Sequence, residues 1–251
     1  MTEALAFDPL VQVLHHQLAA LPDYRTGKNT QYAIKDAALG AFAVFFTQSP
    51  SFLAYQRTMQ QATGRSNAES LFGIGAIPCD NQIRTLLDPV APAQLFPVFA
   101  EVYDALEAAG HLSSWRVFAG QRLIALDGTE YFASKEIHGA CCSQRTHANG
   151  QVTYFHQAIT PVIVAPGRHE VISLEPEFST PPDGHAKQDC EQVAAKRWMA
   201  RQAGRYRSVT IWGDDLYCKQ PFCELLLDHG YNFILVCKPD SHTTLYEWVA
   251  T

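Results

Sequence analysis

The sequence predicts a mixed α/β domain that follows an all-helical N-terminal domain. Up to residue 118, apolar residues recur at helical spacing, whereas from residue 119 onward they alternate or form short continuous runs, as strands do. Two of these runs, Arg122–Leu126 and Ser208–Trp212, lead to the carboxylates Asp127 and Asp214. We therefore expect a helical domain over 1–118 and a mixed α/β domain, with a mixed sheet, over 119–251.

The N-terminal domain is expected to be built from amphipathic helices. Asp80 is a candidate N-cap for the helix over 81–87, and Gly110 is expected to end the last helix. Arg84 would point outward from the helix that Asp80 caps, which makes it a candidate DNA contact. Helices are expected over Pro9–Leu21, Tyr32–Phe46, Pro50–Gln61, Asn81–Leu87 and Pro92–Ala109.

The second domain is expected to place its elements in the order β-β-β-α-β-α-β. The first three strands would form an antiparallel meander, with a turn at 165–168 between the second and third. The elements are expected at Leu123–Leu126, within Val152–Val164, at Glu170–Leu174, at Asp189–Arg201 (helix), Val209–Trp212, Pro221–His229 (helix) and Phe233–Cys237. This order is the signature of the ribonuclease H-like fold, in which the first strand lies beside the fourth and parallel to it.

That fold would bring Asp127 and Asp214 together at one end of the sheet. Both strands read as buried on both faces, and the loops beyond strand ends are where such sheets keep their chemistry. Hard carboxylate oxygens suit Mg²⁺ or Mn²⁺, and a shared cation would offset the repulsion between two carboxylates. The expected chemistry is in-line attack on a phosphate assisted by two metal ions. Alternatively, each aspartate is a turn residue at a strand end.

Several segments together resemble the DDE-type transposases of bacterial insertion sequences, and the resemblance extends through nearly the whole chain. The strongest matches are Leu123–Tyr131, Trp212–Tyr217 and Phe233–His242. Shorter stretches also look like linking motifs of that family: Leu21–Arg25, Ile77–Arg84, Lys187–Glu191 and Ala194–Arg197.

The resemblance implies a function in DNA transposition. Members of the family bind the terminal inverted repeats of a mobile element, commonly as dimers, and cut and join DNA strands with two divalent metals. Asp127 corresponds to the first catalytic aspartate of the family. The second is followed three residues later by tyrosine, as in Asp214-x-x-Tyr217, so Asp214 is preferred over the neighbouring Asp215 as the metal ligand.

The third acid of the family is a glutamate on a helix well beyond the fifth strand. Because this chain stops at Thr251, we expect a truncated transposase that lacks the third ligand. One alternative is a non-catalytic fragment that binds DNA or a full-length transposase. Another is a compact nuclease that uses Glu247, the one acid on a candidate helix in this region.

The charge distribution bears on the DNA contacts. A net charge of -6 is unusual for a generic nucleic-acid binder. The densest basic stretch contains Arg197, Arg201 and Arg205, which would share one helix face, either as a stripe that contacts phosphates or as an ordinary solvated surface. Lys238, in the closing segment of the resemblance, is a further candidate DNA contact.

The seven cysteines and the apolar runs favour a soluble protein with reduced thiols, which we expect in the bacterial cytoplasm, associated with the nucleoid. No apolar run approaches the roughly 20 residues that a membrane span needs. A group of histidines and cysteines is either a zinc site or a set of ordinary loop and strand residues, and it lacks the spacing of a zinc finger. Within that group, His156 would orient a phosphate or water, or else be a hydrogen-bonded core residue. The group comprises His138, Cys141, Cys142, His147 and His156.

Overall fold

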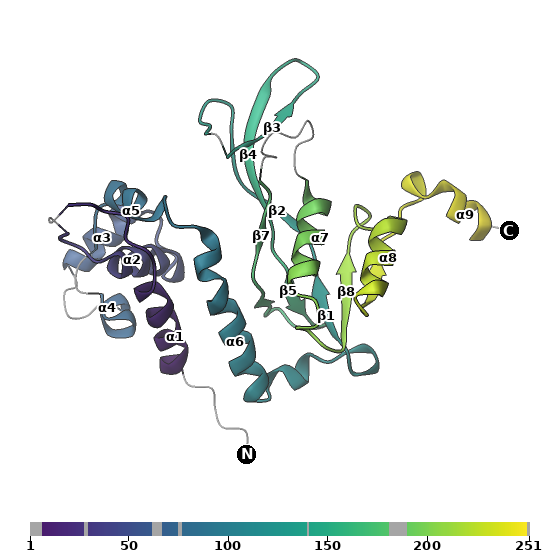
Figure 1. The fold of residues 1–251 in the computed structure, drawn as a ribbon, viewed down its shortest axis with the longest axis horizontal. Helices are drawn as coiled ribbons and strands as arrows, with labels where there is room; N and C mark the ends of the chain where they lie inside the picture. Colours follow the sequence, from purple (N-terminus) through teal and green to yellow (C-terminus); the bar gives the residue numbers. More distant parts are fainter. Residues whose placement is uncertain are drawn as a thin grey trace. The chain divides into compact units, whose positions relative to one another are not determined.

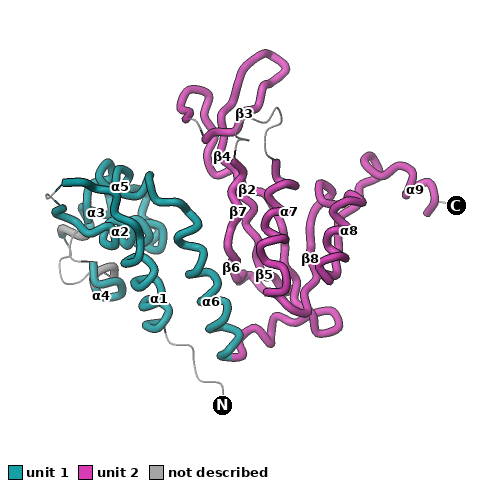
Figure 2. The backbone as a smooth tube through the Cα atoms, viewed as in Figure 1, with its two compact units in different colours: residues 1–109 teal, residues 110–251 magenta. Residues whose placement is uncertain are grey.

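The computed structural model describes residues 7–27, 30–61, 67–74, 77–139, 141–180 and 190–249 (Figure 1). The chain divides into two compact units, Met1–Ala109 and Gly110–Thr251 (Figure 2). The predicted boundary at residue 118 falls inside the second unit. The predicted helix start at Asp189 and the motif residues Lys187 and Gln188 lie outside the described residues.

The described part of the first unit consists of helices and loops around an apolar core. Leu39 and Phe72 are almost completely buried in that core, together with Leu18 and Tyr55. The short helix α4 was not expected from the sequence. The elements are α1 (Phe7–Ala19), α2 (Ile34–Phe46), α3 (Phe52–Gln61), α4 (Asn67–Phe72), α5 (Asp80–Leu87), η1 (Pro92–Leu95) and α6 (Phe96–Ala108).

Two details of the helix ends differ from the prediction. Cys79, with an extended backbone, is the N-cap of α5, so the assignment of Asp80 as the cap was wrong. Asp80 is instead the first helical residue, where the positive end of the helix dipole stabilises its negative charge. The segment from Pro92 begins as the 3₁₀ turn η1 before α6, and Gly110 follows in the left-handed conformation (φ 76°).

The main sheet of the second unit has five strands in the order β6-β5-β1-β8-β9 within the described residues. Strand β1 pairs with β8 in parallel, as predicted, and β8 pairs with β9 in parallel. On the other side β5 is antiparallel to both β1 and β6, which is the predicted meander. The strands are β1 (Arg122–Ala125), β5 (Val162–Val164), β6 (Ile172–Ser173), β8 (Val209–Gly213) and β9 (Asn232–Leu235).

A second, antiparallel sheet was not predicted. It contains β2, β4 and β3 in that order, and β7 also pairs with β4. The segment 152–164, expected to hold one strand, therefore contains two, one in each sheet. The strands of this sheet are β2 (Gly128–Ser134), β3 (Ser143–Thr146), β4 (Val152–Ile159) and β7 (Glu177–Phe178).

Helices complete the second unit. Helix α7 packs against β4 and β7 and buries Trp198 and Met199, while α8 packs beside β9 and buries Phe222 and Leu226. At the end of the chain, α9 contacts η4 and lies beyond the edge of the main sheet (Figure 1). These elements are η2 (His111–Trp115), η3 (Phe118–Gly120), α7 (Glu191–Arg201), α8 (Gln220–Asp228), η4 (Pro239–Ser241) and α9 (Thr243–Val249).

None of the helices in the described part of the chain combines the length and the apolar character needed to cross a bilayer.

Candidate functional site

The parallel pairing of β1 and β8 puts the two predicted aspartates at the same end of the main sheet. Ala125 is the partner of Trp212, and the amide of Leu126 donates to the carbonyl of Trp212 at 2.8 Å. If the same register continued for two more residues, past the ends of both strands, Asp127 would lie opposite Asp214. Adjacent strands lie about 4.8 Å apart, so the two aspartates follow neighbouring strand ends. The charges of both carboxylates act on Tyr217.

Both aspartates turn the chain out of the sheet and keep acceptor capacity. Oδ1 of Asp127 accepts from the amide of Gly128, and Oδ1 of Asp214 accepts from the amide of Leu216, both at 2.9 Å. Both residues are exposed. An ionised carboxylate has about four lone-pair sites, so one local hydrogen bond leaves room for a ligand.

A third carboxylate, Glu191, lies directly over the residue that follows Asp127. A Cβ atom at Gly128 would lie 2.3 Å from Oε2 of Glu191 and 2.6 Å from Nε2 of Gln157. That same Nε2 donates to Oε2 of Glu191 at 2.9 Å. In the sequence, Glu191 stands out only as part of a linking motif. A glycine directly after Asp127 was the one available signal of a close approach there.

Tyr217 connects Glu191 to the loop after Asp214. The tyrosine is fully buried, and its hydroxyl donates to Oε1 of Glu191 at 2.6 Å. Burial raises the pKa of Tyr217 far above its ordinary value, and the hydrogen bond and charge of Glu191, followed by the charges of Asp214 and Asp127, raise it further. The phenol therefore stays protonated as a donor, in the field of three carboxylates.

Asp215 is held by the segment 238–242. Its Oδ1 accepts from the amide of Lys238 at 2.8 Å, and both carboxylate oxygens lie 2.7 Å from the hydroxyl of Ser241. Nδ1 of His242 is 3.2 Å away. The Ser241 hydrogen bond, followed by that of the Lys238 amide, lowers the pKa of Asp215. These bonds use the acceptor capacity that a metal ligand would need, which supports the preference for Asp214.

The basic residues near α7 contact acids of this chain. Arg201 bonds to Glu175 at 2.6 Å and also to Glu177, and Arg197 donates to Glu177 at 2.8 Å. These ion pairs fix α7 to the segment that carries β7. Arg205 lies beyond Arg201, the last residue of α7, so the prediction that all three arginines share one helix face was wrong.

The remaining predicted residues are all exposed. Arg84 is exposed on α5, and the side chain of Lys238 is exposed just after β9. Glu247 is exposed on α9, beyond the sheet edge (Figure 1). Its position gives no support to a compact nuclease built on Glu247.

The group proposed for zinc is spread over the second sheet. Sγ of Cys142 lies 3.4 Å from Nε2 of His156, but His138 stacks on a tyrosine of β4 and Nε2 of His147 bonds a threonine hydroxyl of β4. His156 is half-buried, which favours its reading as a hydrogen-bonded core residue. The predicted candidates, His138, Cys141, Cys142, His147 and His156, do not form a three-ligand group in the part of the chain that the structure describes.

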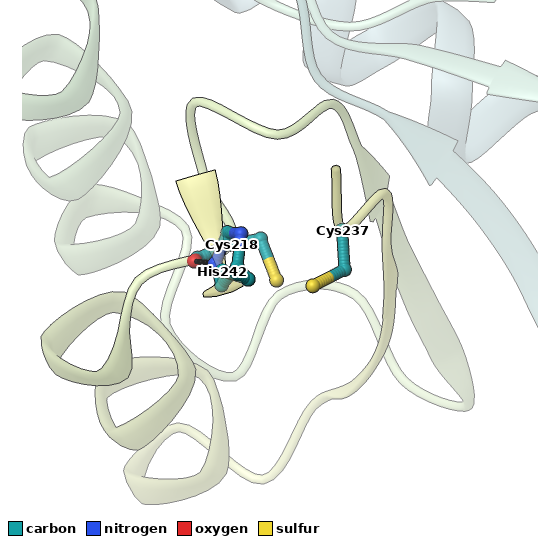
Figure 3. Close-up of side chains that lie close together, drawn as sticks. All are labelled: Cys218, Cys237 and His242. Atoms are coloured by element: carbon teal, nitrogen blue, oxygen red, sulfur yellow. Dashed lines mark hydrogen bonds between the residues drawn. The ribbon is translucent and has the colours of Figure 1, made fainter. Parts of the chain in front are cut away.

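A different trio, Cys218, Cys237 and His242, has ligand atoms within 4.8 Å of one another (Figure 3). Both ring nitrogens of His242 are already hydrogen-bonded, Nε2 to the carbonyl of Cys218 and Nδ1 to Ser241. Burial, followed by the neighbouring Cys237, raises the pKa of the Cys218 thiol to about 11. The trio thus consists of two thiols and an imidazole in the segments that follow β8 and β9, and the imidazole is held by a backbone carbonyl and by Ser241.

No protein-family model matches this chain, and a search of curated proteins finds no match either.

Proposed function

We propose that this chain is a transposase, or a fragment of one, that cleaves and transfers DNA strands at the ends of an insertion sequence with the help of Mg²⁺ or Mn²⁺. The observation that carries the proposal is the parallel pairing of β1 and β8, because Asp127 and Asp214 follow the same ends of these two neighbouring strands. The strand order β6-β5-β1-β8-β9, with β5 antiparallel to β1, supports a ribonuclease H-like catalytic domain.

The carboxylates fit a divalent cation by their chemistry. Asp127 and Asp214 offer hard, exposed oxygen atoms with spare lone pairs, the donor type that Mg²⁺ and Mn²⁺ prefer. When bound, metal ions supply polarisation of the scissile phosphate and activation of a water or a 3′-hydroxyl. The role of the protein is to hold the carboxylates of Asp127 and Asp214 together at the end of the main sheet. Asp215, fixed by segment 238–242, stabilises the loop that carries Asp214.

The proposed partner is DNA carrying the terminal inverted repeats of a mobile element, bound by a homodimer. Arg84, Arg205 and Lys238 are exposed candidate phosphate contacts. Arg197 pairs with Glu177, and Arg201 pairs with Glu175 and Glu177, so a structural role for both arginines is favoured over DNA binding.

The proposal is tested by calorimetric titration of Mn²⁺ into the full chain and into the Asp127→Asn and Asp214→Asn variants. Asp228→Asn, which removes an exposed carboxylate on α8, is the matched control. Both site variants should lose most Mn²⁺ binding, while the control keeps it. Wild-type affinity in both site variants would refute the metal site.

A nicking assay on DNA with candidate element ends separates catalysis from binding. The second candidate function is a non-catalytic fragment that binds DNA or a full-length transposase. One observation favours it: among the described residues, Asp127 and Asp214 belong to no compact group of three metal-ligating side chains. Metal-dependent nicking that Asp127→Asn abolishes would support the enzyme. DNA binding without nicking would support the fragment.

A further inference from the structure

The first turn of α7 is bonded to the loop that carries Asp214. The hydroxyl of Tyr217 donates to Oε1 of Glu191, and Nε2 of Gln192 donates to the carbonyl of Leu216, both at 2.6 Å. Leu216 also binds Oδ1 of Asp214 through its amide. Two consecutive residues of one helix therefore hold two of the three residues that follow Asp214.

The same carboxylate reaches the turn that carries Asp127. Oε2 of Glu191 accepts from Gln157 of β4 at 2.9 Å and occupies the space that a Cβ at Gly128 would need. Gly128 begins β2, where it pairs with Ile159 of β4. Glu191 is thus in contact with the chain immediately after each of the two strands that deliver the aspartates.

The two carboxylate oxygens of Glu191 accept from two different donors, the phenol of Tyr217 and the amide of Gln157, and the two hydrogen bonds together fix the orientation of the carboxylate. Tyr217 is fully buried and packs on Phe222, so its hydroxyl has a fixed direction. The ring also approaches the position where a Cβ of Gly213 would lie, at 2.9 Å, which fixes it against the end of β8.

We infer that Glu191 is a positioning residue of the proposed metal site: by binding Tyr217 and Gln157 it holds the Asp127 turn and the Asp214 loop in register. This inference rests on the proposed function. Glu191 acts through Tyr217 and Gln157 and not by touching the substrate. Residues that orient the ligands of a metal typically contribute 10- to 100-fold to its affinity.

The test is Mn²⁺ titration of the full chain carrying Glu191→Gln or Tyr217→Phe. Glu191→Gln keeps the side-chain volume and removes the charge, whereas Tyr217→Phe removes only the hydroxyl. Glu224→Gln is the matched control, because Glu224 also accepts from a glutamine amide, that of Gln220, but on the exposed surface of α8. Urea unfolding of the metal-free proteins, run in parallel, measures any structural effect.

Both site variants should bind Mn²⁺ about 10- to 100-fold more weakly than the wild type, with the control unchanged. A residue with only a structural role would lower the urea midpoint and leave the affinity of the folded protein intact. Wild-type affinity in Glu191→Gln, when Asp127→Asn has lost binding, overturns the inference alone. If Glu191→Gln does not fold, Tyr217→Phe decides in the same way. Wild-type affinity in Asp127→Asn removes the proposed function and this inference with it.

Discussion

Replacing Gly128 with alanine should destabilise the second unit by breaking the contacts of Glu191. The new Cβ would lie 2.3 Å from Oε2 of Glu191 and 2.6 Å from Nε2 of Gln157. Both atoms are the ends of flexible side chains, so they can move, but the movement separates Glu191 from the buried hydroxyl of Tyr217. A hydrogen bond to a charged group contributes about 1.5–3 kcal/mol. Alanine also restricts the unfolded chain more than glycine does, which stabilises the folded protein by about 0.4–1 kcal/mol. The net loss is about 1–2 kcal/mol.

Urea unfolding followed by tryptophan fluorescence measures this effect in the correct unit. All four tryptophans, Trp115, Trp198, Trp212 and Trp248, lie in the second unit. Gly139→Ala is the control, because no atom lies within 4 Å of its Cβ position, and it should be neutral or slightly stabilising. If Gly128→Ala is as stable as Gly139→Ala, the placement of Glu191 over Gly128 is refuted.

Two further changes test the neighbouring acids and arginines. The pKa of Asp215 is lowered in the fold, so its contribution is present above its unfolded value of 3.8 and is lost as pH falls through the folded pKa. Asp215→Asn should therefore lose less stability than the wild type as the pH falls through and below 3.8, measured as the urea midpoint at each pH. Equal losses would contradict the contacts from segment 238–242. Arg201→Met breaks the ion pairs with Glu175 and Glu177, whose side chains are both mostly buried. It should lower the free energy of unfolding by about 1–2 kcal/mol. This is less than the roughly 3–5 kcal/mol lost when a fully buried pair is broken, because Arg201 is partly exposed. Its DNA affinity and salt dependence should stay at the wild-type values, and a reduced salt slope would instead restore Arg201 as a phosphate contact.

The strands of the main sheet could be predicted because burial leaves a strong pattern in the sequence. All four residues of β1 are buried, as are four of the five in β8, and a continuous apolar run is the sequence form of such a strand. The right-handed crossover between parallel strands then limits how the two can be joined. Their side-by-side placement follows from pattern and topology together.

The second sheet could not be predicted because its strands have little apolar pattern. Strand β3 consists of Ser, Gln, Arg and Thr, and only its first residue is buried. In β2 the exposed positions do not alternate with buried ones. Strands β2 and β3 are held by backbone pairing with β4. When neither face of a strand enters a core, backbone pairing alone produces no alternation of apolar and polar residues in the sequence.

Glu191 shows the same limit for the candidate site. Its partners are 26 and 34 residues away in the sequence, on different elements, and an acid in the first turn of a helix is common for reasons of helix dipole alone. The motif that contains Glu191 was visible, but its contact with the Asp127 turn depends on where α7 packs. Only tertiary placement distinguishes it from other acids such as Glu247.

Asp214 and Asp215 show how adjacent identical side chains can have different roles. Successive side chains at the end of a strand point to opposite sides. The charge of Asp214 acts on Tyr217, whereas Asp215 turns to segment 238–242 and binds Ser241. The spacing Asp214-x-x-Tyr217 therefore has a physical basis. The chain makes one turn, in which the amide of Tyr217 donates to the carbonyl of Asp214, and the hydroxyl of Tyr217 then reaches Glu191. A site that depends on this geometry should tolerate the loss of the Asp215 charge, as Asp215→Asn, far better than the loss of the Tyr217 hydroxyl.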